Sequence, residues 1–266
     1  MSDLSLNLFG AVSAEFEGRP LKKFRTTKTQ ALLIYLAVDP PIAQQREALM
    51  TLLWPDMPLE SAQTNLRQIV YQLRKAIPEV VARGGGENVP LILSERQTVQ
   101  LNPQAAVTVD TVSFSNLMEA VQSHEHSDLS SCPFCQARLE EAVDLYKGPF
   151  LSDFYLDDSN EFEDWAHRRR EAYRRQVMDG LAALAEGSMR RAEVSQAQSY
   201  AQRQLELDDL DERAYRQFME ALAREGRRHE ALAVYEEATR LLRDDLGMSP
   251  AAQTTRLAEH IENDSL

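Results

Sequence analysis

A 34-residue repeat in the second half of the chain constrains the fold more than any other feature of the sequence. The repeat consists of Ala197, Ala201 and Leu207, which recur as Ala231, Tyr235 and Leu241, each 34 residues later. This spacing is typical of stacked helix pairs, because one pair alone cannot bury its apolar face. A second helix is expected over residues 211–225, ended by Gly226. The pattern predicts an all-α interaction scaffold, and two periods leave a generic helical bundle as the alternative.

The acidity of the chain is confined to its second part. The whole sequence has a net charge of -13. Residues 1–105 contain 11 basic and 10 acidic residues, a net charge of +1, whereas the remainder contains 18 and 32, a net charge of -14. Acidic proteins rarely bind nucleic acids, but here the first part does not carry the acidity. The length and the charge division predict two domains, over residues 1–105 and 106–266.

Several classes of protein are excluded by simple features of the sequence. The longest apolar run, residues 31–38, has eight residues, whereas a membrane span needs about 20. The N-terminus lacks the basic-then-apolar pattern of a secretory signal. Two cysteines cannot form a disulfide framework for a chain of this size. We therefore expect a cytoplasmic protein with no membrane partner.

The first part of the chain has the order of elements of a winged helix-turn-helix domain. The predicted elements are strands within residues 4–16, a turn over 17–20, helices beginning near 28, 45 and 59, and two short strands around a turn at 95–97. Thr27 is the expected N-cap of the first helix. The triple glycine at 84–86 predicts a flexible linker, because no Lys-Ser/Thr follows it as in a phosphate-binding loop. The expected fold is mostly α with small β.

The third predicted helix, residues 59–77, has two chemically different faces. Its apolar stripe comprises Leu66, Ile69, Val70, Leu73 and Ile77. Its opposite face comprises Thr64, Arg67, Gln68, Tyr71 and Lys75, and this face contains no acidic residue. Arginine and lysine read guanine in the major groove, glutamine reads adenine, and remaining cations contact phosphates. We predict that this face reads DNA and that Arg96, at the hairpin tip, contacts the flanking backbone. An ordinary solvated helix face is the alternative.

A cluster of histidine and cysteine residues predicts a metal site. His124, His126, Cys132 and Cys135 fall within twelve residues of sequence. Two imidazoles and two thiolates form the ligand set of a closed, structural zinc site. Two alternatives stay open: a redox pair, although the strand-then-helix context of thioredoxin-like sites is missing, and two idle thiols beside histidines in a polar loop. No other cofactor is expected.

Other side chains of the second half have structural interpretations. Phe150, Phe154, Tyr155, Phe162 and Trp165 are expected to form the core that joins its first helices. The sequence contains no G-x-S-x-G, H-E-x-x-H, G-x-G-x-x-G or Walker A motif, so we do not expect an enzyme.

Together, these stretches resemble a known family of bacterial regulators. Residues 21–101 resemble the OmpR-type winged helix, most specifically over Leu53-Trp-Pro-Asp-Met-Pro and the helix that follows. Residues 110–262 resemble the tetratricopeptide-like bacterial transcriptional activator domain, through residues 145–154, 162–165 and 241–250. This is the order seen in SARP-like transcriptional activators. The resemblance implies binding to repeated elements of promoter DNA and contact with RNA polymerase. A homo-oligomer on DNA is a further expected partner, through the helical half.

The leading hypothesis is therefore a sequence-specific transcriptional activator. The alternative is a protein-interaction adaptor whose winged helix and helical repeats bind protein partners. The near-zero net charge of residues 1–105 keeps this alternative open, because phosphate contacts dominate nucleic-acid affinity.

Overall fold

The described residues pack into two compact units. The computed structural model describes residues 4–21, 24–39, 42–125 and 128–264. The first unit comprises the residues up to Asn116 together with Leu145–Tyr173, and the second comprises Leu117–Asp144 and Arg174–Leu266. The predicted domain boundary at residue 105 is not one of the boundaries between these two units. It remains a prediction about how the domains follow one another along the sequence.

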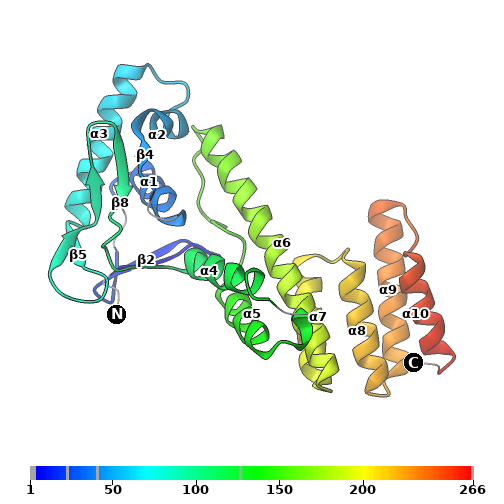
Figure 1. Ribbon diagram of the computed structural model, residues 1–266. Helices are drawn as coiled ribbons and strands as arrows, with labels where there is room; N and C mark the ends of the chain where they lie inside the picture. Colours follow the sequence, from blue (N-terminus) through cyan, green and yellow to red (C-terminus); the bar gives the residue numbers. More distant parts are fainter. Residues whose placement is uncertain (1–3, 22–23, 40–41, 126–127, 265–266) are drawn as a thin grey trace. The chain divides into compact units, whose positions relative to one another are not determined.

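The first unit combines short strands with three helices near the N-terminus (Figure 1). The strands are β1 (Leu4–Asn7), β2 (Ser13–Phe16), β3 (Arg19–Pro20), β4 (Gln44–Gln45), β5 (Glu79–Val81), β6 (Asn88–Pro90), β7 (Ile92–Ser94), β8 (Thr98–Leu101) and β9 (Val107–Val109), and the helices are α1 (Thr27–Val38), α2 (Arg46–Leu53) and α3 (Leu59–Ala76). The described strands form sheets of order β3-β2-β1-β9, β4-β8-β7 and β5-β6. β1 pairs antiparallel with β2 and parallel with β9, with Leu4 opposite Phe16 and Val107.

Two local details differ from the sequence expectation. The N-cap of α1 is Thr26, whose side chain accepts a hydrogen bond from the amide of Thr29, and not Thr27, which is the first helical residue. Both threonines can cap a helix, so residue type alone does not separate them. The triple glycine, predicted to be a flexible linker, forms the loop between the paired strands β5 and β6. All three glycines there have positive φ, which other residues rarely adopt.

Aromatic side chains from distant parts of the chain form the core of the first unit. The ring of Phe9 lies 5.4 Å from that of Phe114, 5.0 Å from that of Tyr146 and 5.1 Å from that of Tyr173. The carboxylate of Asp110 accepts hydrogen bonds from the amides of Leu8, at 2.8 and 2.9 Å, and Phe9, at 2.9 Å. These contacts attach the segment 107–116 to the N-terminal strands.

The segment 145–173 also packs against the winged helix. Phe150 and Phe162 are fully buried, whereas Tyr155 is 56% exposed. Trp165 contacts the rings of Phe150 and Phe162 and also that of Tyr35 on α1. The expectation that these aromatic residues form a core is confirmed for all but Tyr155, and this core extends beyond the first helices of the second half to Tyr35 of α1. Most of them are core residues of the unit that contains the winged helix, and Tyr155 is not a core residue.

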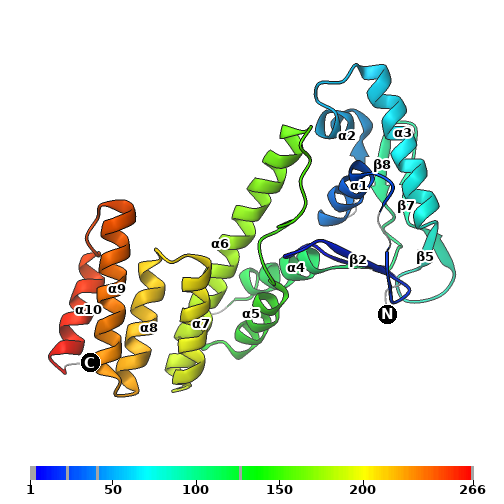
Figure 2. The same ribbon diagram turned by 180° about the vertical axis from the view of Figure 1, so that it is seen from behind.

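Helices form the second unit, and two of them continue from the first. Their bounds are α4 (Asp110–Gln122), the short 3-10 helix η1 (Leu129–Ser131), α5 (Pro133–Leu145), α6 (Asn160–Arg190), α7 (Val194–Leu207), α8 (Glu212–Arg224), α9 (Arg228–Leu246) and α10 (Ala252–Glu262). Helices α7 to α10 lie side by side in chain order in both views (Figures 1 and 2). No helix among the described residues is long and apolar enough to cross a bilayer.

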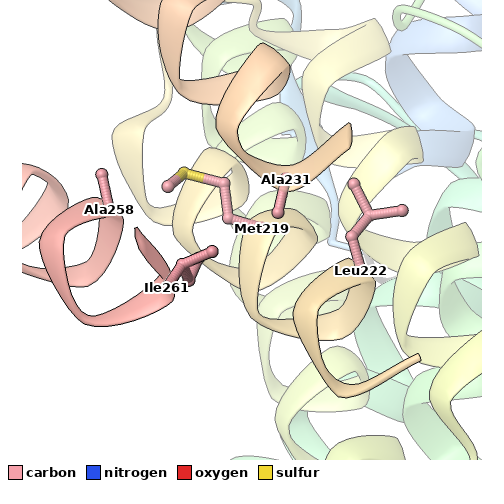
Figure 3. Packing of buried hydrophobic residues seen from close by; sticks show 5 residues of the cluster. All are labelled: Met219, Leu222, Ala231, Ala258 and Ile261. Atoms are coloured by element: carbon pink, nitrogen blue, oxygen red, sulfur yellow. The ribbon is translucent and has the colours of Figure 1, made fainter. Parts of the chain in front are cut away.

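The 34-residue repeat corresponds to two helix pairs, α7–α8 and α9–α10. Ala197 and Ala231 both lie three residues after the start of their helix, and both are buried. Asp211 caps α8 through its side chain, which accepts from two backbone amides, and Gly226 follows the helix, as expected, with a φ of 76°. In the cluster of Met219, Leu222, Ala231, Ala258 and Ile261, side chains of α8, α9 and α10 interlock, and the alanines let the helices approach closely (Figure 3). The second unit is a tetratricopeptide-like all-α module.

Candidate nucleic-acid interface

Helix α3 is held in place by its apolar stripe. Leu66, Ile69, Val70 and Leu73 are buried, as is Ile77, which follows the helix. They pack α3 against α1, α2 and β7. The helix ends at Ala76, and the amide of the next residue, Ile77, donates to the carbonyl of Leu73. The 3.6-residue period thus fixes which side of α3 is buried and which side is left for solvent.

All five residues predicted on the opposite face are exposed. These are Thr64, Arg67, Gln68, Tyr71 and Lys75. Tyr71 is 66% exposed, which is unusual for a large aromatic side chain and leaves both its ring and its hydroxyl accessible. The hydroxyl of Thr64 donates to the carbonyl of Glu60 in the preceding turn, at 3.0 Å. The five residues offer cationic, amide and phenolic groups, and the acidic residue on the same side of the helix is Glu60, which is exposed in its first turn.

Arg74 belongs to the same face, although the sequence analysis did not select it. It is exposed and lies seven residues after Arg67, which places the two side chains on nearly the same line along the helix. The helical period alone could therefore have predicted that Arg74 lies on this face. Arg74 adds a third cation to this face, beside Arg67 and Lys75.

The wing is the hairpin of β7 and β8. Ser94 lies opposite Val99, and the amide of Glu95 donates to the carbonyl of Thr98, at 2.9 Å, which closes the turn. Arg96 is exposed in this turn, as predicted. β4 pairs with β8 on the other side, with Gln45 opposite Thr98. The start of α2 is therefore attached directly to the wing.

Arg46, which the sequence analysis missed, fixes the wing turn. Its Nη2 donates to the hydroxyl of Ser94, at 2.6 Å, its Nε donates to the carbonyl of Glu95, at 3.1 Å, and its backbone amide donates to the carbonyl of Gln97, at 2.9 Å. These partners are about fifty residues away in sequence, so no local pattern could reveal them. Burial, and then the nearby charge of Arg67, lower the pKa of the Arg46 guanidinium.

A polar cleft lies between α3 and the wing. It is lined by the start of α2, including Gln45 and Arg46, by Gln63 and Arg67 of α3, and by Arg96 and Gln97 of the wing. Three arginines thus line one concave surface. The lining also contains Glu47 and Glu95, so the three arginines exceed the acidic residues of the cleft by one.

The histidine and cysteine cluster lies in the second unit. His124 follows α4, Cys132 follows η1, and Cys135 lies in the first turn of α5. The structure brings these three side chains together, and His126 lies outside the described residues. A hydrogen bond from the amide of Cys135 lowers the pKa of the Cys132 thiol, whereas burial raises that of Cys135.

Comparisons with known proteins agree with this architecture. A model of the bacterial transcriptional activator domain matches residues 109–262. The regulatory protein DnrI of Streptomyces peucetius is 25% identical over 260 residues, which are 97% of this chain and 92% of DnrI. The structure of Mycobacterium tuberculosis EmbR in complex with a low-affinity phosphopeptide matches with a TM-score of 0.74 at 21% identity, over 100% of this chain and 66% of the EmbR chain. This structural match shows that the fold is shared.

The fold and the exposed helix define a class of protein: a winged helix-turn-helix followed by a tetratricopeptide-like helical module. Within that class, the chain belongs to the family that carries the bacterial transcriptional activator domain, since the family model covers more than half of its length. The resemblance to SARP-like transcriptional activators is confirmed.

Proposed function

We propose that the protein activates transcription by binding specific promoter DNA with α3 and the wing. The observation that carries this proposal is the exposed face of α3 with Arg67, Gln68 and Lys75, next to a wing that is fixed to α2 by Arg46. In this arrangement α3 enters the major groove, where Arg67 reads guanine and Gln68 reads adenine. Arg74, Lys75 and Arg96 contact phosphates, which position the protein but do not specify sequence.

The helical unit supplies the second half of the proposed activity. We infer that it contacts RNA polymerase or a second copy of the chain on repeated DNA elements. The support is the family description as an activator domain and the net charge of -14 beyond residue 105, which disfavours contact with the duplex. Such a regulator acts where the chromosome is, in the cytoplasm.

The test is a selection of DNA sequences by the full chain from a library of random duplexes. We expect one enriched motif, bound with an affinity that falls steeply with salt, by a logarithmic slope of about 0.9 for each phosphate contacted. The control variant Arg19→Ala, which removes an exposed cation from β3, should keep the motif and the slope. Absence of enrichment, or binding that does not change with salt, would favour the protein-interaction adaptor.

A further inference from the structure

We propose that His124, Cys132 and Cys135 bind a structural zinc ion. This site is independent of the DNA-binding face and concerns a different part of the fold. The proposal rests on these three residues alone, all of which belong to the second unit. Their donor atoms, one from each side chain, all lie within 4.8 Å of one another.

The distances between the donor atoms match a tetrahedral zinc site. The Nδ1 atom of His124 lies 3.2 Å from the sulfur of Cys135 and 3.6 Å from that of Cys132. With zinc–sulfur bonds of about 2.3 Å and zinc–nitrogen bonds of about 2.0 Å, tetrahedral angles place nitrogen and sulfur about 3.5 Å apart. The two distances lie on either side of this value, so only small shifts of the side chains are needed.

The donor types select the metal. Two thiolates and one imidazole are soft and borderline ligands, which suit zinc and disfavour magnesium or calcium, whose ligands are oxygen atoms. Cys135 is fully buried and Cys132 is half-buried, so the ion would be shielded from solvent on one side.

Polar contacts also hold this segment, among them an ion pair between Asp128 and Arg190 of α6 and a hydrogen bond from Gln136 to the carbonyl of Leu129. Between α4 and α5 the only regular element among the described residues is the three-residue helix η1. Asp128 caps it by accepting from the amide and the hydroxyl of Ser130. On the other side of the cysteines, Gln136 donates to the carbonyl of Ala183 on α6, at 3.2 Å. Zinc would join His124, two residues after α4, to the start of α5 and so close this connection.

The experiment uses the full chain, purified without a histidine tag, loaded with zinc sulfate and then dialysed. We expect about one zinc per chain by elemental analysis, and a lower content in Cys132→Ser, Cys135→Ser and His124→Ala. The control His229→Ala removes an exposed histidine of the same unit and should keep the metal. Zinc should also raise the thermal midpoint of the wild type but not that of His124→Ala.

A second measurement does not depend on the folding of any variant. The chain has only two cysteines, and both belong to the site, so a thiol reagent reports on it alone. In the zinc-loaded wild type both thiols should react slowly, and a chelator should restore fast reaction. Cobalt in place of zinc should give the intense absorption of a tetrahedral thiolate complex. A zinc-loaded, dialysed protein that is folded, metal-free and has two freely reacting thiols would overturn the proposal, as would a disulfide that persists in a reducing buffer.

Discussion

The indole ring of Trp165 lies 5.0 Å from the phenol ring of Tyr35, which joins α6 to the first helix of the winged domain. Two further contacts join residues 159–169 to the winged domain. Arg169 forms an ion pair with Asp39, and the hydroxyl of Ser159 donates to the carbonyl of Leu52. Residues that the activator-domain model matches are therefore part of the core that supports the proposed DNA-reading helix.

The first prediction concerns this core. Trp165→Ala should lower the free energy of unfolding by about 3–5 kcal/mol, because it removes a large buried side chain and leaves a cavity that the neighbouring residues fill only in part. Urea denaturation measures the loss, and DNA binding should weaken in parallel. Tyr155→Ala, at an exposed position ten residues earlier, should change stability little. Equal stability of the two variants would contradict the packing described.

The second prediction separates the two kinds of DNA contact on α3. Arg67→Ala should weaken binding to the selected motif by about 1–3 kcal/mol and relax the preference at one base position, because it removes a base contact. Lys75→Ala should weaken all sequences alike and reduce the salt slope by about one. Titration of motif and scrambled duplexes over a range of salt concentrations distinguishes the two. If both variants bind as the wild type does, α3 does not read DNA.

The third prediction concerns the support of the wing by Arg46. Arg96→Ala should reduce the salt slope by about one, because one phosphate contact is lost. Arg46→Ala should have a similar effect, because the turn that presents Arg96 loses two side-chain hydrogen bonds. The double variant should then be less impaired than the sum of the two single changes. Strict additivity would mean that Arg46 acts independently of the wing.

The fourth prediction is a pH dependence from Asp110. Burial raises the pKa of this carboxyl above its ordinary value, although the amides of Phe9, Leu8 and Thr111 partly offset the rise. Between about 3.9, the value in the unfolded chain, and the higher folded value, the folded state binds more protons. The free energy of unfolding should therefore fall as the pH rises through this window.

The comparison is with Asp110→Asn, which does not titrate. The stability of the wild type minus that of the variant should decrease as the pH rises above about 4, measured by thermal denaturation in matched buffers. A difference that grows with pH would instead show that the hydrogen bonds to the carboxylate outweigh its burial.

The fifth prediction compares two glycines of α6. A Cβ atom at Gly187 would lie 2.2 Å from Oε1 of Gln136 and 2.8 Å from the carbonyl oxygen of Ser130. The added methyl group should cost about 1–3 kcal/mol through overpacking. Alanine favours a helix over glycine by about 1 kcal/mol, which is the smaller effect, so Gly187→Ala should destabilise the protein. At Gly180 the nearest atoms are side-chain carbons at 3.4 Å, so Gly180→Ala should be neutral or stabilising. Urea denaturation of both variants checks the order.

Local patterns predicted most of the elements, because helices and hairpins are defined by contacts close in sequence. The stripe on α3 and the turn of the wing are examples, and the exposed face of α3 follows from the same period. Contacts across long sequence separations were missed: Trp165 with Tyr35, and Arg46 with the wing, leave no periodic signal. For the cysteine cluster, spacing predicted which residue types could meet, but only the structure shows that His124 reaches both sulfurs.

Each unit is assembled from two separate stretches of chain, so the polypeptide passes between the units three times, the last time inside α6 at Tyr173 and Arg174. No single crossover point can therefore exchange one unit between relatives. In a chimera that joins a foreign winged domain to this chain at residue 105, the foreign α1 would face Trp165 of this chain, against which its own residues are not matched. Altering the operator preference of such a regulator would call for grafting individual side chains onto α3 and the wing, with residues 145–173 retained.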